Sequence, residues 1–535
     1  MVGDVDGEDF ARARDGDAAA RALGEVDILC SSHRSKRNGR MPLPTAGADG
    51  KPLVLLTQPL FPDFAAALEG RYRLVLAADA DAATAGEVRV LLVPGLKVVT
   101  AELIGRLPAL ELVVATSVGV DHVDLDACRR RGIAVTNAGA AFSVDSADYA
   151  VGLLVAVLRR VAAAEAYLRR GRWATDGKYP LATKVSLTCQ IFHTTSLQNS
   201  GLLHQKEMAL APPTQEAAAS GYHQDGACKP LVLLADPLIP EFEPELSARY
   251  RLLPVVRADA ATVAWARALL TVDLPAVTAD LIDALPALEL VVASSAGLDH
   301  IDLAACRRRG IRVTNAGGAY SADAADYAVG LVVAALRGVP AADAYVRRGG
   351  WVANGEYPLA NKVSGKRVGI VGLGRIGSLV ARRLAAFGCP VAYHSRSPKP
   401  SSPYKFFPTV RALAADSDVL VLSCALTEET RHMVNREVME ALGKDGVLVN
   451  VGRGGLVDEP ELVRCLREGV IGGAGLDVYD KEPDVPTELF AMENVVLSDH
   501  RAVITPESIG GALDIVSGNL EAFFAGKALL SPVTL

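Results

Sequence analysis

The chain has 535 residues, of which 50% are hydrophobic and 22% charged, and its formal net charge at pH 7 is −7. This length predicts roughly three or four domains with large buried cores. The negative charge provides no global basic field, so neither nucleic acid nor a membrane is expected as a partner.

Two further features favour the cytosol. No apolar run of about 18 residues lacks a charge or a turn former, and the N-terminal stretch is acidic where a secretory or transit peptide would be basic. The eight cysteines lie far apart without a CxxC pair. This spacing indicates reduced thiols rather than a disulfide framework or a metal site.

The two low-complexity stretches of the chain are residues 1–50 and 187–228. Both mix Gly, Asp, Ala, Ser and Pro, and the second also contains Gln. We predict a disordered leader at 1–50 and a linker at 187–228.

A long internal repeat starts after the leader. KPLVLL begins at Lys51 and again at Lys229, an offset of 178 residues, and residues 51–186 (the first repeat) recur at this offset without a gap (the second repeat). The period is far longer than that of a solenoid, so we interpret it as a duplicated domain segment.

The two repeats continue differently. The second enters a glycine-rich motif directly, whereas the first leaves the pattern after Ser186. Similar leaders precede both repeats, opening at Met41 and at Met208. We hypothesise that two neighbouring paralogous genes, or their gene models, have been joined; abundant transcripts spanning both parts would exclude an artefact.

From residue 229 onward, short apolar runs rich in Val and Leu alternate with helical segments. Such alternation predicts α/β architecture with parallel sheets and crossover helices. A ligand is then expected beyond the carboxyl ends of the strands.

The motif KRVGIVGLGRIG at 366–377 follows a predicted strand and opens a helix. Its glycines Gly372, Gly374 and Gly377 have the spacing that lets a backbone approach a dinucleotide pyrophosphate. Taken alone, the motif is also compatible with a glycine-rich turn that binds no nucleotide.

The turn after the next strand bears on the choice of cofactor. An NAD site usually places Asp or Glu here to bind the ribose hydroxyls, but this chain has Ser395, Arg396 and Ser397, followed by Lys399. A guanidinium flanked by hydroxyls suits a 2′-phosphate, so NADPH is predicted over NADH. The alternative is an ordinary exposed basic turn.

Polar residues follow three later predicted strands: Arg453, then Asp477 and Glu482, then His500. Each has a structural alternative, since Arg453 could pair with a structural carboxylate, Glu482 could be a solvated loop charge, and His500 could cap a strand.

In this order, the motifs resemble those of the D-isomer-specific 2-hydroxyacid dehydrogenases, closest to the plant-type hydroxypyruvate, glyoxylate and hydroxyphenylpyruvate reductases. The matching landmarks are VTNAGGAYSADAADYAVGL, VGIVGLGRIG, HSRSPKP, VNVGRGGLVDEPELVRCL, GAGLDVYDKEP and the closing LSPV. The resemblance covers residues 229–535, whereas the first repeat matches only the N-terminal part of the family.

The resemblance implies a Rossmann-type, doubly wound NADP-binding domain at 327–504. It also implies a smaller flavodoxin-like substrate-binding domain made of 229–326 and 505–535. The first repeat, 51–186, is then a partial duplicate of the substrate-binding domain. A homodimer through the nucleotide domain is also implied.

The same resemblance assigns residue roles. Arg453 would bind the carboxylate of a 2-oxo acid, His500 would protonate the carbonyl oxygen, and Glu482 would hold the imidazolium. Substrate would also meet the Ala296-Gly297 amides. The cofactor would contact the remaining residues, namely Leu373, Arg375 and Ile376 in the glycine turn, Val451 and Gly452 beside the nicotinamide, and Asp477 at its carboxamide.

Two departures from the family pattern bear on these roles. Asp499 precedes the histidine where Pro is usual, and this carboxylate could raise the histidine pKa or pull the ring away. The segment 294–299 reads SSAGLD where the first repeat keeps the commoner SVGVD, which allows drift in substrate choice.

The resemblance also indicates that the first repeat is incomplete. In the family, the C-terminal segment completes the substrate-binding domain, and the helix equivalent to 145–160 packs on the nucleotide domain. Because one such set is available, we predict that the first repeat is inert, folds marginally and exposes an apolar face.

The sequence therefore predicts an NADPH-dependent reductase of small 2-oxo acids, with hydroxypyruvate or glyoxylate as substrate. Two alternatives stay open: a reductase of bulkier acids such as hydroxyphenylpyruvate, and a catalytically silent, nucleotide-sensing scaffold.

Overall fold

The computed structural model of the chain describes residues 51–180, 229–272 and 274–535. The predicted leader at 1–50 and linker at 187–228 lie outside these residues. The described residues form two compact units, one ending at Ala147 and one starting at Asp148.

The first unit contains a five-stranded parallel sheet with the order β2-β1-β3-β4-β5. Its strands are β1 (Leu53–Leu56), β2 (Arg73–Leu76), β3 (Val90–Val93), β4 (Leu112–Ala115) and β5 (Ala134–Thr136). Its helices are α2 (Pro62–Glu69), α3 (Ala82–Glu87), α4 (Ala101–Gly105) and α5 (Leu125–Arg131). Asp81, Thr100 and Asp124 cap the last three by accepting a hydrogen bond from an amide three residues on.

The second unit contains an equivalent five-stranded parallel sheet. Its order, β7-β6-β8-β9-β10, matches that of the first sheet strand for strand. The strands are β6 (Leu231–Leu234), β7 (Arg251–Pro254), β8 (Ala268–Thr271), β9 (Leu290–Ala293) and β10 (Arg312–Thr314). The helices around it are α9 (Glu243–Arg249), η2 (Val255–Arg257), α10 (Ala260–Trp265), α11 (Ala279–Asp283), α12 (Leu303–Arg308) and α20 (Pro506–Phe524).

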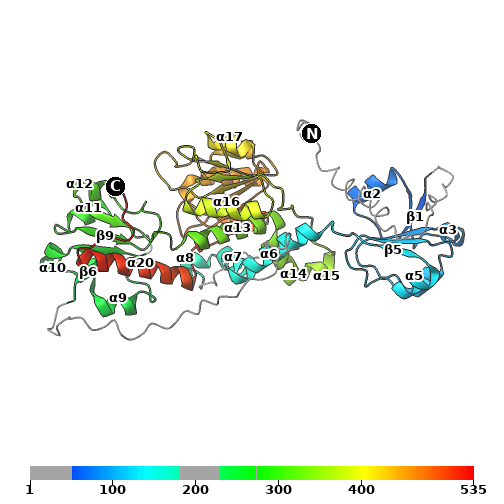
Figure 1. Cartoon of the computed structure of the whole chain (residues 1–535), viewed down its shortest axis with the longest axis horizontal. Coiled ribbons are helices and arrows are strands. Elements are labelled where there is room, and N and C mark those ends of the chain that lie inside the picture. The colour runs from blue at the N-terminus through cyan, green and yellow to red at the C-terminus, as the bar shows by residue number, and fades with distance from the viewer. Residues whose placement is uncertain (1–50, 181–228, 273) are drawn as a thin grey trace, which may run out of the picture. The chain divides into compact units, whose positions relative to one another are not determined.

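Helix α20 distinguishes this sheet from that of the first unit. It runs along the sheet on the side of α9 (Figure 1), where Val516, Leu520 and Phe523 form one core cluster with Leu270 and Leu290. The C-terminal helix thus forms part of the core of this sheet.

A seven-stranded parallel sheet forms the nucleotide-binding domain, with the order β13-β12-β11-β14-β15-β16-β17. Its strands are β11 (Val368–Val371), β12 (Val391–His394), β13 (Lys405–Phe406), β14 (Val419–Leu422), β15 (Val447–Asn450), β16 (Gly473–Leu476) and β17 (Val495–Leu497). This is the doubly wound order expected of a dinucleotide-binding fold, so the predicted fold class is confirmed.

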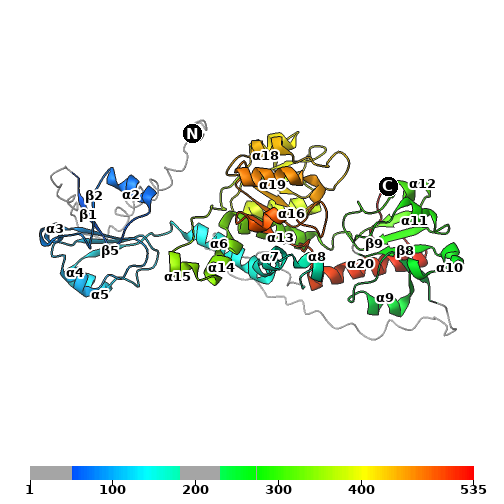
Figure 2. The same cartoon turned by 180° about the vertical axis from the view of Figure 1, so that it is seen from behind.

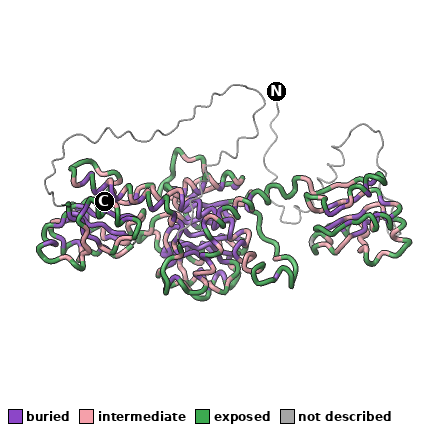
Figure 3. The backbone as a smooth tube through the Cα atoms, turned by 90° about the horizontal axis from the view of Figure 1, so that it is seen from below, coloured by how far each residue is buried: buried purple, intermediate pink, exposed green. Residues whose placement is uncertain are grey.

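Helices cover both faces of this sheet. One face carries α13 (Ser321–Arg337) and α16 (Arg375–Ala386), seen in Figure 1, and the other carries α18 (Arg436–Leu442) and α19 (Glu459–Glu468), seen from behind in Figure 2. Three shorter elements complete the domain: α17 (Val410–Ala415), η3 (Gly454–Leu456) and η4 (Thr487–Ala491). Buried residues are concentrated in the strands of the sheet and in α13. Figure 3 colours buried residues purple along the backbone.

The boundary between the units differs from the predicted domain limit at 186. The second unit starts at Asp148, within α6 (Ser143–Leu158), and it includes the rest of that helix, α7 (Val161–Arg169) and α8 (Arg172–Asp176). Together with α13 of the second repeat, they pack on the nucleotide-binding domain. The other two equivalent helices, α14 (Val339–Arg347) and α15 (Gly350–Asn354), are more exposed. The helix at 145–160 therefore shares the one nucleotide domain instead of lacking one.

An exposed apolar face is present on the first repeat, as predicted. Leu153, Leu154 and Val157 on α6 are 41%, 50% and 72% exposed, whereas Leu331 and Val332, the equivalents of the first two on α13, are fully buried. The difference arises because β15 and β16 lie against α13.

No single helix among the described residues is long and apolar enough to cross a membrane. Helices α13 and α14 reach the length and apolar composition of a membrane span only when taken together, and they are bent by 60° relative to each other.

Candidate active site

The turn between β11 and α16 is shaped by its glycines. Gly372 has φ +95°, and a Cβ there would lie 2.7 Å from the main chain of Cys424, while a Cβ on Gly377 would lie 2.1 Å from the Gly372 carbonyl oxygen. A Cβ on Gly374 would meet no protein atom within 4 Å. The first and third glycines are thus required by packing, and the second faces open space.

That open space is a cavity of about 660 Å³. It is lined by Gly372, Leu373, Gly374, Ser395, Arg396, Ser397 and Lys399, all predicted to contact the cofactor. A glycine-lined helix N-terminus and a basic, hydroxyl-rich turn in one cavity fit the pyrophosphate and ribose of a dinucleotide.

Other predicted cofactor residues lie outside this cavity's lining. Arg375 donates from Nη1 to the carbonyl of Gly317 at 3.2 Å, and Ile376 packs against the core of the nucleotide domain. Val451 is buried in the same core, and Gly452 donates its amide to Asn450.

Sequence reasoning missed the side of the cavity that follows β14. Ser423, Cys424, Thr427 and Thr430 line it, as does Glu429. The available signal was topological, since β14 pairs with β11 and its carboxyl end must therefore border the glycine turn. A hydrogen bond from Thr427 lowers the pKa of Glu429, and Arg396 makes a smaller contribution.

His500 and Glu482 form a close pair. His500 Nδ1 lies 2.7 Å from Glu482 Oε2, and Glu482 Oε1 accepts from the amide of Tyr479 at 3.0 Å. The His500 amide donates to the Asp477 carbonyl at 2.8 Å, in a backbone conformation with φ +52°. Because the carboxylate occupies Nδ1, Nε2 is the ring nitrogen available for proton transfer.

Arg453 connects the nucleotide-binding domain to the substrate-binding domain. Its Nε lies 3.0 Å from Asp299 Oδ1, and its Nη1 donates to the Gly452 carbonyl at 2.8 Å. A Cβ on Gly297 would lie 2.0 Å from Arg453 Nη2. The guanidinium therefore packs directly on the Ala296-Gly297 segment, and sequence reasoning had not anticipated Asp299 as its partner.

Asp477 is buried beneath the His500 loop. Its carboxylate accepts hydrogen bonds from Ser498 Oγ at 2.5 Å and from the amides of Arg501 and Ala502 at 2.9 and 3.1 Å. Burial raises the pKa of Asp477, and nearby His500 opposes that shift. With both oxygens bonded internally, Asp477 holds the loop that carries His500.

Asp499 does not draw the His500 ring away. Its Oδ2 accepts from the amide of Tyr179 at 2.7 Å, and its Oδ1 lies 3.3 Å from Arg501 Nη1. The ring pairs with Glu482 instead. The residue that departs from the family pattern therefore contacts the first repeat.

Comparison with known proteins decides the family. The NAD binding domain of the D-isomer specific 2-hydroxyacid dehydrogenases matches residues 329–502, and the catalytic domain of that family matches residues 54–220. A hydroxyphenylpyruvate reductase of Plectranthus scutellarioides is 50% identical over 308 residues, which are 56% of this chain and 98% of the relative. The chain belongs to the D-isomer specific 2-hydroxyacid dehydrogenases.

Other members of this dehydrogenase family support the assignment. A glyoxylate/hydroxypyruvate reductase of Arabidopsis thaliana is 61% identical over 259 residues, covering 48% of this chain and 80% of the relative. An NADPH-dependent glyoxylate/hydroxypyruvate reductase from Sinorhizobium meliloti, solved with NADP and malonate, is 38% identical with a TM-score of 0.54, covering 57% of this chain and 97% of that one. The protein is thus an oxidoreductase with an NAD-binding domain.

Proposed function

We propose that the protein reduces small 2-oxo acids, with hydroxypyruvate or glyoxylate as substrate and NADPH as the preferred reductant. The observation that carries the proposal is the 2.7 Å pair of His500 and Glu482. The bound cofactor supplies the hydride. The proton and the binding of the substrate carboxylate are supplied by residues of this chain.

The proton is the first requirement. Hydride addition to a ketone creates an alkoxide, and His500 can protonate it from Nε2 while Glu482 stabilises the imidazolium through Nδ1. The buried Asp477 fixes the His500 loop through three hydrogen bonds, so the imidazole is oriented before substrate arrives.

Binding of the substrate carboxylate is the second requirement. The Nε of Arg453 donates to Asp299, and its Nη1 donates to the Gly452 carbonyl. The remaining nitrogen, Nη2, packs against Gly297. A 2-oxo acid entering at Gly297 would meet this Nη2 and the adjacent main-chain amides, which suit a carboxylate.

The preference for NADPH is supported by Ser395, Arg396, Ser397 and Lys399, which share the cavity of the glycine turn. A phosphate on the ribose would interact favourably with Arg396 and Lys399. Glu429 in the same cavity is the one charge of opposite sign in its described lining. We expect Arg396→Ala to lower kcat/KM for NADPH at least ten-fold and to leave that for NADH nearly unchanged.

A larger substrate is the second candidate. It is favoured by the relative named hydroxyphenylpyruvate reductase, which this chain matches over 98% of its length. Pocket size depends on side chains from two domains, so the substrates must be compared directly.

The test is NADPH oxidation by the full chain with hydroxypyruvate, glyoxylate and hydroxyphenylpyruvate in parallel and NADH as control. We expect His500→Gln to lower kcat by about 10²–10⁴-fold while NADPH still binds. Tight NADPH binding without turnover of any acid would replace the reductase proposal with the scaffold.

Three further proposals extend the sequence predictions. We propose that the repeat arose by tandem duplication, which the identical strand orders of the two five-stranded sheets support. We propose the cytosol as compartment, consistent with the free Cys128, Cys306, Cys389, Cys424 and Cys465. We also propose that the homodimer interface implied by the family resemblance lies on the nucleotide-binding domain.

A further inference from the structure

Helices α6 and α13 contact each other reciprocally. A Cβ on Gly152 would lie 2.3 Å from Val333 Cγ1, and a Cβ on Gly330 would lie 2.5 Å from Val155 Cγ1. Gly152 and Gly330 are equivalent residues of the two repeats, offset by 178, and so are Val155 and Val333. Each glycine therefore receives the valine of the other repeat.

A second pair of contacts follows the same rule. Arg159 lies 4.9 Å from the ring centre of Tyr327, and Arg337 lies 4.9 Å from that of Tyr149. These residues are again equivalent at the offset of 178. Reciprocal contacts of this kind are the mark of a two-fold interface between two copies of one chain. Here, both halves of that interface belong to a single chain.

The α7–α8 segment continues from this interface onto the nucleotide-binding domain. Arg169 donates to four main-chain carbonyls between residues 489 and 495 at 2.6 to 3.2 Å. Trp173 is 6% exposed and packs edge-on against Tyr479 at 5.8 Å. Glu165 accepts from the amide of Leu497. The segment is bound by both main-chain hydrogen bonds and apolar burial.

The equivalent α14–α15 segment of the second repeat has different surroundings. Arg347, the equivalent of Arg169, bonds Asp343 on its own helix, and Trp351, the equivalent of Trp173, is 62% exposed. Val346 is 52% exposed where its equivalent, Leu168, is buried. The described residues contain one nucleotide-binding sheet, and α7–α8 occupies the surface that a second such segment would need.

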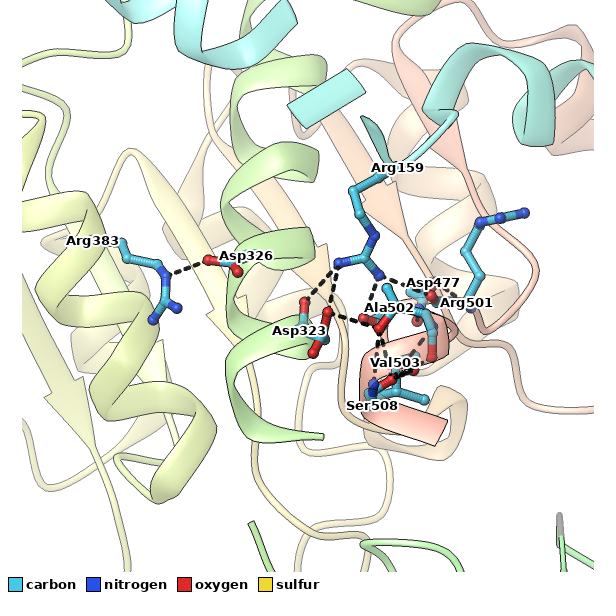
Figure 4. A network of polar contacts seen from close by, with 10 residues as sticks. Arg159, Asp323, Asp326, Arg383, Asp477, Arg501, Ala502, Val503 and Ser508 are labelled. Carbon is cyan, nitrogen blue, oxygen red and sulfur yellow. Dashed lines mark hydrogen bonds and ion pairs between the residues drawn. The ribbon is translucent and has the colours of Figure 1, made fainter. Parts of the chain in front are cut away.

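The bound segment reaches the loop that carries His500. Arg159 donates to the carbonyls of Arg501 and Ala502 at 3.2 and 2.7 Å, and Figure 4 shows it directed between Asp323 and Ala502. Arg501 donates to the Pro180 carbonyl at 2.9 Å. Residues on both sides of His500 are therefore held by the first repeat.

We propose that residues 148–180 replace, within the same chain, the α13–α15 segment of a second subunit. They fill the surface of the nucleotide-binding domain that a second copy would otherwise cover, and they hold the His500 loop through the hydrogen bonds of Arg159 and Pro180. The full chain is consequently a monomer. The α14–α15 segment of the second repeat stays exposed in it.

The three tryptophans of the chain, Trp173, Trp265 and Trp351, allow a direct test. Trp265 and Trp351 are more than half exposed, so replacing both by Phe leaves the buried Trp173 as the single reporter. The matched control retains Trp351 alone. Acrylamide quenching and light scattering after size exclusion are measured on both full-length variants.

We expect a mass near 56.1 kDa at all concentrations and a quenching constant for Trp173 several-fold lower than that for Trp351. A mass of twice that value with Trp173 still protected would overturn the proposal, because the segment would then come from another chain. Equal quenching of the two reporters would overturn it as well, because the segment would not be docked.

A pair of double variants tests replacement of the second subunit. In Arg169→Ala/Trp173→Ala the freed surface should accept the α14–α15 segment of another copy, so the mass should rise with concentration. The control Arg347→Ala/Trp351→Ala should stay monomeric. The proposal would be contradicted if Arg169→Ala/Trp173→Ala stays folded by circular dichroism and remains monomeric at every concentration.

Discussion

The two repeats show how one sequence pattern acquires different stability from its surroundings. In the second repeat, Leu270, Leu290 and Val292 are buried beneath α20. Their equivalents in the first repeat, Leu92, Leu112 and Val114, are only half-buried. The strand order is the same in both sheets. The difference shows that pairing of strands is encoded within the repeat, whereas burial of the second face depends on a helix more than 200 residues away.

The largest expected difference between the repeats is in hydrogen exchange. Helix α20 buries Val516, Leu520 and Phe523, and each such side chain contributes roughly 1.5–3 kcal/mol. Amides of β8 and β9 should therefore open with a free energy at least about 4 kcal/mol higher than those of β3 and β4. Exchange measured by mass spectrometry on the full chain gives both values in one sample.

Leu520→Ala sharpens this comparison. It should lower the opening free energy of β8 and β9 by about 2–4 kcal/mol and leave β3 and β4 unchanged. Equal protection of the two sheets in the unmodified chain would show that the first repeat has a stabilising contact of its own.

The next effect concerns equivalent tryptophans. Trp173→Ala should destabilise the nucleotide-binding domain by about 3–5 kcal/mol, because the ring is buried against Tyr479. Trp351→Ala should cost less than about 0.5 kcal/mol, because the side chain is mostly exposed. Hydrogen exchange of residues 476–497 measures both. Similar losses in the two variants would mean that Trp351 is also covered in solution.

The equivalent carboxylates Asp148 and Asp326 have different partners, and Asp326 gives a pH effect. Asp148 accepts from the amide and hydroxyl of Ser364, whereas Asp326 pairs with Arg383 at 2.6 Å. Burial raises the pKa of Asp326 to about 6, and Arg383 opposes this. The folded state therefore binds this proton more tightly than the unfolded chain. Its stabilising contribution is complete below about pH 4 and is lost as the pH rises through 6.

The expected size is about 2–3 kcal/mol between pH 4 and pH 7. Unfolding of the nucleotide-binding domain is compared between the full chain and Asp326→Asn at both pH values. Between pH 4 and pH 7, the free energy of unfolding of Asp326→Asn should increase by that amount relative to that of the unmodified chain. An identical difference at both pH values would show that Asp326 is ionised throughout.

Some of these features could be predicted from sequence because they are local. The spacing of Gly372, Gly374 and Gly377 identifies the turn, and the order of Arg453 and His500 identifies the family. The docking of α7–α8 could not be predicted, because the repeats are similar there and the sequence does not say which segment occupies a single shared surface. Side chains such as Asp499, which bond across 320 residues, carry no local signal.

The smallest effect concerns Asp299 and its equivalent in the first repeat, Asp121. Asp299 accepts a hydrogen bond from Arg453. The glycine-rich motif and the sequence that carries Arg453 directly follow the second repeat but not the first, so Asp121 has no equivalent of Arg453. Asp299→Asn weakens a charge-assisted pair that is partly exposed, so we expect kcat/KM for the 2-oxo acid to fall about ten-fold, or ~1.4 kcal/mol. Asp121→Asn should change it less than two-fold.

The direction of this result decides what Asp299 does. If it orients the guanidinium toward Gly297, its loss leaves Arg453 with more rotamers and raises KM. If it instead competes with the substrate carboxylate for the same guanidinium, Asp299→Asn would lower KM. An equal fall of kcat/KM in Asp121→Asn would break the comparison itself, because the first repeat would then contribute to the active site.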